Sequence, residues 1–190
     1  MSALDITPDN PRIVLIFSPA RSVRESNLAA VREVMEQGIG VVIVTINQPA
    51  RSLARHYQKN GVDTASLRFI DTVTKYAGGD AQEDMPGSIF LHRPDDLTGL
   101  SIAITEALKD PGEQKTCILV DSINAMLIYI SSADLLKFIH YLTSKLKILE
   151  ISGIFLAVES GLDPALLARL TAISDGVIEI GGVPAGPRQA

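Results

Sequence analysis

Asp121 and Ser122 are an acidic residue and a hydroxyl residue that end the apolar run in the stretch KTCILVDS, residues 115–122. A short apolar run without alternation predicts a strand that is covered on both faces, as in the middle of a parallel sheet. The carboxyl end of such a strand lies at the crevice in which open α/β sheets bind ligands. An aspartate there is suited to hold Mg²⁺ beside a nucleotide. The alternative is an aspartate that only leaves the core and caps the next segment, and this stretch alone does not decide between the two.

Two arginines, Arg21 and Arg24, fall at the amino end of the first expected helix. The amino end of a helix attracts anions, so this pair is a candidate for holding a phosphate. The alternative is that both are solvated charges, one of them paired with Glu25. Glu159 and Ser160 follow a later buried strand at the edge of the sheet that also holds Asp121, and they are either ligand contacts or solvated loop residues.

The other residues that often carry chemistry are sparse. The three histidines, His56, His92 and His140, lie on separate elements without the spacing of metal ligands, so no metal site is predicted. The one cysteine, Cys117, lies inside an apolar strand, which predicts a buried, inert thiol rather than a nucleophile.

Apolar runs that predict strands alternate along the chain with segments of helical periodicity. The expected strands are residues 12–17, 39–46, 67–71, 88–91, 117–120, 153–158 and 177–180. The expected helices are residues 22–37, 49–60, 95–109, 131–150 and 163–174. This alternation predicts a three-layer α/β fold, a mostly parallel twisted sheet with helices on both faces. The strands at 12–17, 39–46, 117–120 and 154–158 are expected among its central ones.

The chain is expected to hold one domain, residues 12–181, between a flexible leader at 1–11 and a flexible tail at 182–190. Residues 72–87, with Gly78, Gly79 and several acids, are expected to form a surface loop. Hydrophobic residues are 46% of the 190 residues, which is typical of a globular protein, and the net charge of -5 disfavours a broad nucleic-acid surface. No run of about 18 apolar residues exists, so no membrane span is predicted, and a cytoplasmic protein is the expectation.

Taken in order, several stretches resemble the RecA-like P-loop ATPases, and most of all their KaiC-like group. The stretch KTCILVDSINAMLIY resembles the Walker B strand of the group, and VVIVTINQPARSLARHYQKNGVDTASLRFID resembles its unit of strand, helix, glycine turn and strand. DDLTGLSIAITEAL resembles the helix before Walker B, and ISDGVIEI the closing strand. The resemblance runs from residue 12 to residue 180 and implies the P-loop NTPase fold.

The chain departs from this family at the phosphate loop. A working loop has the pattern GxxxxGK[ST], in which glycines let successive N–H groups surround a phosphate. Ser18 and Val23 stand where the glycines are expected, Arg24 replaces the lysine, and Glu25 replaces the hydroxyl that binds Mg²⁺. A glutamate there faces phosphate oxygens of like charge.

A second departure follows the second strand, where the family places an acid that polarises the attacking water. Asn47 and Gln48 stand there, and an amide cannot take a proton from water. The resemblance therefore implies a catalytically inactive, pseudo-ATPase domain, with no catalytic residue, no metal site and no cofactor expected. Such a domain would act through protein–protein contacts, as a regulator or assembly partner, by binding a protein partner or by self-association.

The alternative is an ATP-binding protein or weak ATPase of the RecA/KaiC type that binds ATP and magnesium by a variant loop. DNA binding is disfavoured, because net charge is negative and no basic loop follows the fourth core strand. If the site is inactive, Asp121 is expected to accept hydrogen bonds from nearby backbone N–H groups, from Ser22 or Ser122, or from Arg24. Arg24 is the favoured partner, since the lysine that it replaces lies near the Walker B acid in the family, and such a pair would fill the phosphate site. The degenerate nucleotide site would consist of Ser18, Arg21, Ser22, Arg24, Asp121 and Ser122.

Overall fold

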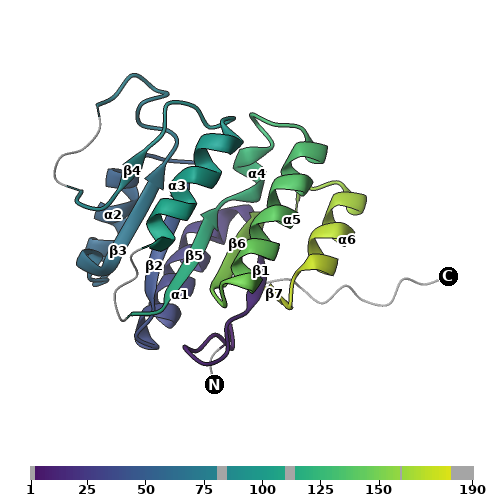
Figure 1. The fold of residues 1–190 in the computed structure, drawn as a ribbon, viewed down its shortest axis with the longest axis horizontal. Coiled ribbons are helices and arrows are strands. Elements are labelled where there is room, and N and C mark those ends of the chain that lie inside the picture. The colour runs from purple at the N-terminus through teal and green to yellow at the C-terminus, as the bar shows by residue number, and fades with distance from the viewer. Residues whose placement is uncertain (1–2, 81–84, 110–113, 159, 181–190) are drawn as a thin grey trace.

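The structure, a computed structural model, describes residues 3–80, 85–109, 114–158 and 160–180, and in these residues seven strands form one sheet. All neighbouring strands run parallel (Figure 1). The strands are β1 (Ile13–Ser18), β2 (Gly40–Thr45), β3 (Leu67–Asp71), β4 (Ile89–Phe90), β5 (Thr116–Asp121), β6 (Ser152–Val158) and β7 (Gly176–Glu179). The predicted α/β fold with a parallel sheet is therefore confirmed.

The order of the strands is β4-β3-β2-β5-β6-β1-β7, so β5 lies in the centre of the sheet. All residues of β1, β2 and β5 are buried, because helices cover both faces. Strand β6 lies between β1 and β5, with Ser18 opposite Val158 and Asp121 opposite Leu156. The ends of β1 and β5 are therefore separated by two strand spacings, about 10 Å.

Helices cover the sheet on both faces, as the sequence predicted (Figure 1). On one face lie α1 (Val23–Glu36) and α2 (Ala50–Lys59). On the other face lie α3 (Leu97–Lys109), the short α4 (Ile123–Met126), α5 (Ser132–Ile148) and α6 (Pro164–Ile173). Because side chains of a strand alternate between faces, Cys117 and Leu119 join the core under α1 and α2 while Ile118 and Val120 join the other.

The boundaries of the long elements agree with the sequence prediction to within about two residues, which is the usual uncertainty of helix ends. The prediction missed α4 and the two 3-10 turns, η1 (Ala20–Ser22) and η2 (Thr64–Ser66). A single turn is too short to show helical periodicity in the sequence.

The segment before β1 differs from the flexible leader that we expected. Leu4 and Ile6 are only 4% and 1% exposed and belong to the core under α1 and α2. Leu4 N–H donates to Glu33 Oε1 over 2.6 Å, and Arg12 pairs with Asp5 over 2.7 Å. This segment is therefore packed on the domain, while the expected tail at 182–190 lies outside the described residues.

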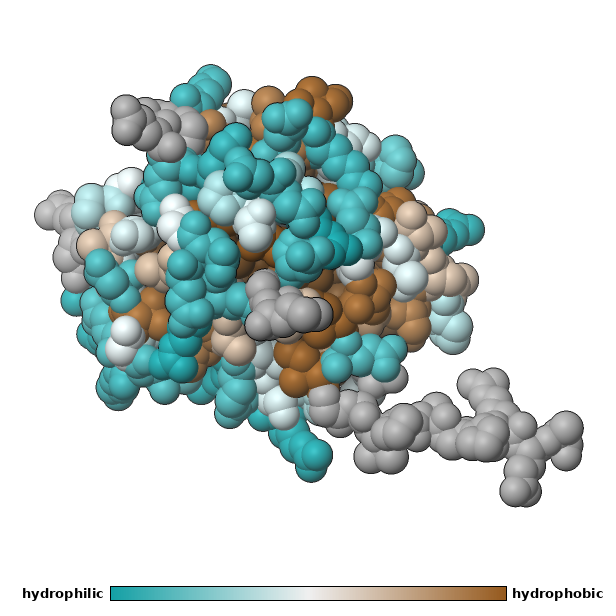
Figure 2. Space-filling model, turned by 90° about the horizontal axis from the view of Figure 1, so that it is seen from below, coloured by the Kyte–Doolittle hydropathy of each residue, from teal (hydrophilic) through white to brown (hydrophobic). Residues whose placement is uncertain are grey.

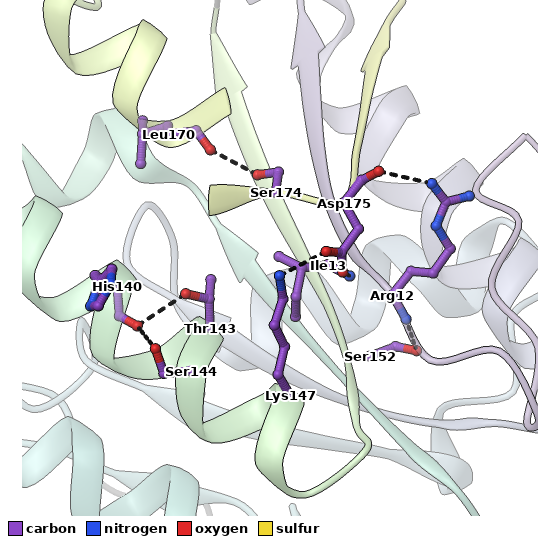
Figure 3. A network of polar contacts seen from close by, with 10 residues as sticks. All are labelled: Arg12, Ile13, His140, Thr143, Ser144, Lys147, Ser152, Leu170, Ser174 and Asp175. Carbon is purple, nitrogen blue, oxygen red and sulfur yellow. Dashed lines mark hydrogen bonds and ion pairs between the residues drawn. The ribbon is translucent and has the colours of Figure 1, made fainter. Parts of the chain in front are cut away.

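Asp175 ties the edge strand β7 to the rest of the domain (Figure 3). Its Oδ2 accepts the N–H of Ile13 over 2.9 Å and its Oδ1 accepts Lys147 Nζ over 2.7 Å. Arg12 Nη2 donates to its carbonyl oxygen over 3.0 Å. Burial alone would raise the pKa of Asp175, but the hydrogen bonds from Lys147 and Ile13 and the charge of Arg12 hold it below its usual value. One aspartate thus links the end of α6 to β1 and to α5.

The amino edge of the sheet carries hydrophobic side chains gathered among polar ones, as the view from below shows (Figure 2). At this edge α5 ends before β6 begins, and Ile148 and Leu149 are 82% and 47% exposed. No helix among the described residues is long and apolar enough to cross a membrane.

Gly153 on β6 lies directly against the side chain of Leu146 on α5. A Cβ atom at this position would lie 2.8 Å from Leu146 Cδ1 and 3.2 Å from Ile13 Cδ1, and both side chains are buried. We expect Gly153→Ala to lower the free energy of unfolding by about 1–3 kcal/mol through overpacking, measured by urea unfolding. Gly40→Ala is the control, because its Cβ would come no nearer than 3.5 Å to another atom. Equal stability of the two variants would contradict the expectation.

Candidate functional site

The candidate site at the carboxyl edge of the sheet begins with the connection from β1 to α1. Residues 19–22 separate Ser18 from Val23. Pro19 precedes the turn η1, which is closed by a 2.9 Å hydrogen bond from Ser22 N–H to the Pro19 carbonyl. Pro19 and Ser22 have φ angles of -57° and -112°, and no residue of this connection has a positive φ. The connection is a tight right-handed turn between strand and helix.

Two serine hydroxyls close the floor of this connection. Ser26 Oγ donates to the Ser22 carbonyl over 2.9 Å, and it lies 2.8 Å from Ser18 Oγ. Ser18 and Ser26 are 0% and 2% exposed. Both hydroxyls are therefore bonded within the protein, and Ser18 is one of the residues that the sequence predicted for the phosphate site.

Asp121 lies beneath α1 and α2 in a buried polar cluster with Asn27 and Tyr57, which we call the Asp121 cluster. The three residues are 3%, 2% and 0% exposed. Tyr57 OH donates to Asn27 Oδ1, and the Tyr57 ring stacks on Phe69 with centroids 6.5 Å apart. Sequence reasoning missed Asn27 and Tyr57, although an asparagine among the core-facing residues of a helix is a signal of buried polar contact.

The Asp121 cluster lacks partners for two of its polar atoms. Asn27 faces the Asp121 carboxyl group, but neither Asn27 Nδ2 nor Asp121 Oδ1 forms a hydrogen bond of normal geometry. Burial raises the pKa of Asp121 to about 6, against the opposing effects of Asn27 and of the Arg24 charge. Burial, together with the nearby Asp121 charge, also raises the pKa of Tyr57, against the hydrogen bond to Asn27. A carboxyl group that ionises near neutral pH is therefore enclosed at the end of β5.

The ion pair expected between Arg24 and Asp121 is not formed in the described structure, and this corrects the sequence prediction. Arg24 is exposed in the first turn of α1, whereas Asp121 lies two strands away beneath the helix. The arginine acts on the carboxyl group only through space, by lowering its pKa. The two side chains stay apart because the charged end of a long side chain has a lower free energy in water than in a buried ion pair.

The six predicted site residues lie at this one edge, but in different surroundings. Ser18, Asp121 and Ser122 are buried, Ser22 is half-buried, and Arg21 and Arg24 are exposed. Ser122 precedes α4 as its N-cap residue without a side-chain capping bond. Glu159 lies outside the described residues, whereas Ser160 is exposed.

Asp71, at the end of β3, is a buried acid that accepts four hydrogen bonds. Its Oδ2 accepts Ala50 N–H over 2.7 Å and Thr74 Oγ1 over 2.6 Å, and its Oδ1 accepts Val73 N–H over 2.7 Å and Thr74 N–H over 2.8 Å. It is 0% exposed. The aspartate therefore joins the start of α2 to the loop after β3, so the first part of the predicted surface loop is anchored.

Asn124 performs a similar task at the end of β6. Its Oδ1 accepts the N–H of Val158 over 2.7 Å, and its Nδ2 donates to the carbonyl of the same residue over 3.2 Å. The sequence showed no signal for the role of Asn124, because its partner is 34 residues away.

Asn47 and Gln48 are the two amides that stand where the family has an acid. Asn47 is exposed, and Gln48 is half-buried.

The histidines and the cysteine lie apart from this edge cluster. His56 is on α2, His92 follows β4, and His140 is on α5. Within the described ranges no group of three His, Cys, Asp or Glu side chains is placed to hold a metal ion. Cys117 is 0% exposed, and burial raises the pKa of its thiol, so the predicted burial of this residue is confirmed.

The parallel sheet, with β6 between β1 and β5 and an acid at the end of its central strand, has a fold that is also found in KaiC-like proteins. A solved structure of the KaiC-like protein PH0186 from Pyrococcus horikoshii OT3 superposes with a TM-score of 0.61 at 18% identity, covering 88% of this chain and 70% of that one. The uncharacterized protein PH0321 from Pyrococcus horikoshii, solved in complex with an unknown peptide, gives a TM-score of 0.67 at 17% identity, covering 88% and 76%.

The chain belongs to the family DUF7504, a family of unknown function, whose pattern matches residues 15–180. No curated protein is similar enough in sequence to count as a relative. The likeness to the two solved structures supports the resemblance to KaiC-like proteins at the level of the fold.

Proposed function

We propose that this protein is a non-hydrolysing KaiC-like domain that acts through protein–protein contacts, as a regulator or assembly partner. The observation that carries the proposal is the connection from β1 to α1. An anion-binding nest needs successive N–H groups in a backbone that alternates between right- and left-handed conformations. Residues 19–22 contain no positive φ, and Ser22 N–H is already bonded to Pro19. This supports a degenerate phosphate loop.

The surroundings of Asp121 support the same proposal. A Walker B acid acts on Mg²⁺ beside a nucleotide. Here Asn27 and Tyr57 enclose the carboxyl group, which is 3% exposed and has a pKa raised to about 6. A metal ligand must be deprotonated, so a carboxyl group with a raised pKa binds a metal ion less readily than an exposed carboxylate. Glu25, exposed in the first turn of α1, adds a negative charge where phosphate would lie.

A role in protein contacts is supported by side chains that the fold leaves uncovered. Among the described residues Ile128 is 73% exposed and Ile148 is 82% exposed, and Tyr76, 55% exposed, packs edge-on against Tyr129 with centroids 5.6 Å apart. Large apolar and aromatic side chains are enriched in binding surfaces. The similar Pyrococcus horikoshii protein that was solved with an unknown peptide makes a peptide partner a reasonable proposal for this chain too.

The second candidate is nucleotide binding without turnover, which the exposed Arg21 and Arg24 at the amino end of α1 favour. We expect no shift of the melting temperature with ATP and Mg²⁺ and no ATP hydrolysis above background. Binding at 100 times Kd would add about 2.7 kcal/mol of stability. For a chain of this size that is a rise of roughly 5–10 °C, which thermal denaturation resolves.

The same measurement on two variants separates the candidates. A rise in melting temperature that disappears in Arg24→Gln would establish nucleotide binding at this edge and contradict the leading proposal. ATP hydrolysis that disappears in Asp121→Asn would overturn it as well, since a contaminating ATPase does not respond to this substitution. Arg55→Gln on the exposed surface of α2 is the matched control for Arg24→Gln.

A further inference from the structure

We propose that the groove between α5 and α6 binds an acidic, amphipathic segment of a partner protein. This inference rests on the proposed role in protein contacts and assigns the surface and the chemistry of the partner. The groove is lined by side chains of α5 and α6 and of the residue that caps α6. The two helices run side by side (Figure 1).

The groove consists of two adjoining hollows along the line where the two helices meet. The first hollow has a volume of about 460 Å³, and the second, nearer the start of both helices, has about 320 Å³. They share Leu136 and Arg169, so they form one groove. It extends along α5 from Ser132 to His140, about 12 Å at the rise of an α-helix. This length accommodates about two turns of a bound helix.

The floor of the groove is apolar. Leu136 and Ile173 are half-buried, Leu166 is 5% exposed, and Ala172 is exposed beside them. Side chains of this kind bind the apolar face of an amphipathic helix, which presents residues spaced by three and four positions. A nucleic acid would instead need a long basic surface without such a floor.

The rim of the larger hollow is basic, although the chain has a net charge of -5. Lys137, His140 and Arg169 line this hollow without a carboxyl group, whereas Asp163 lines the smaller hollow and accepts hydrogen bonds from the N–H groups that start α6. Lys137 pairs with Asp134 at 3.4 Å, but both side chains are more than half exposed, so the pair is weak. A positive rim on a negatively charged protein selects a partner that carries acidic residues beside its apolar ones.

Polar contacts beside the groove link α5 to the end of α6 and lie within the two helices (Figure 3). Lys147 on α5 donates to Asp175, which follows α6, over 2.7 Å. Ser174 Oγ donates to the Leu170 carbonyl over 2.9 Å and closes the last turn of α6. Thr143 and Ser144 donate to the carbonyl of His140 over 3.0 and 2.8 Å. A preformed groove loses less conformational entropy on binding than a mobile one.

The test is a titration of the full chain with fluorescein-labelled amphipathic peptides, followed by fluorescence anisotropy. The acidic probe has leucines on one helical face and glutamates beside them, and the control probe has lysines in place of the glutamates. We expect a micromolar Kd for the acidic probe only. Arg169→Glu should raise this Kd at least about tenfold, which is the effect of losing one well-formed charged contact. Ala172→Phe fills the floor of the groove without changing its charge and should also raise the Kd.

Arg55→Glu is the matched control, because Arg55 is exposed on α2, on the opposite side of the sheet, and should leave the Kd within about twofold. Equal binding of both probes, no binding of the acidic probe, or an unchanged Kd in Arg169→Glu would overturn the proposal. A dimer in light scattering that Arg169→Glu dissociates would also overturn it, since a second copy would then occupy the groove. The titration contains no nucleotide, so a negative result in it does not change the result expected with ATP. A negative or positive result with ATP likewise does not decide whether the groove binds the peptide.

Discussion

Asp71→Ala is expected to lower the free energy of unfolding by about 3–5 kcal/mol, the largest effect of any single substitution that we propose. The carboxyl group is fully buried and accepts four hydrogen bonds, from the N–H groups of Ala50, Val73 and Thr74 and from the Thr74 hydroxyl. Removing it leaves these donors without their acceptor in the interior. Urea unfolding, followed by circular dichroism, measures the loss.

Two variants control this result. Asp71→Asn keeps one acceptor oxygen and should show a smaller loss. Asp63→Ala removes an exposed cap that accepts a single hydrogen bond, from Ala65 N–H over 2.9 Å, and should cost about 1 kcal/mol or less. If Asp71→Ala were no more destabilising than Asp63→Ala, the role of Asp71 in joining α2 to the loop after β3 would be refuted.

Asp121→Asn is expected to stabilise the protein at pH 8 by up to about 3 kcal/mol and to change little at pH 4. The pKa of Asp121 is raised to about 6 from 3.8, chiefly by burial. An acid with a raised pKa in the folded state favours folding while it is protonated, below about pH 4. This contribution is lost as the pH rises from about 4 to about 6, because the carboxyl group then ionises in the unfolded chain while it stays protonated in the folded one. The neutral amide removes that loss.

The measurement is urea unfolding of both proteins at pH 4, 6 and 8. Asp175→Asn is a control of opposite sign, because the pKa of Asp175 is lowered by Lys147, Ile13 and Arg12 in spite of its partial burial. Its contribution is present above the unfolded pKa and is lost as pH falls, so this variant should be less stable than the parent at pH 8. Solvent screening keeps that effect small. A difference between Asp121→Asn and the parent that did not change with pH would contradict an ionising buried carboxyl group.

The amino-acid sequence by itself determined the elements and the class of the fold. The continuous apolar runs of β1, β2 and β5 predicted buried parallel strands, because a strand covered on both faces has no reason to alternate. The sequence also determined which residues stand in the connection after β1. Local chemistry decides these features, so neighbours along the chain carry enough information to predict them.

Only the tertiary structure decided which of these residues meet. Arg24 stays exposed in the first turn of α1 and does not pair with Asp121, which is buried. The packing of α1 and α2 on the sheet instead brings Asn27 and Tyr57, 30 residues apart, together above the end of β5. The burial of Leu4 and Ile6, expected to lie in a flexible leader, was also decided there. The physical reason is that burial and pairing depend on contacts between residues far apart in sequence, which local periodicity does not contain.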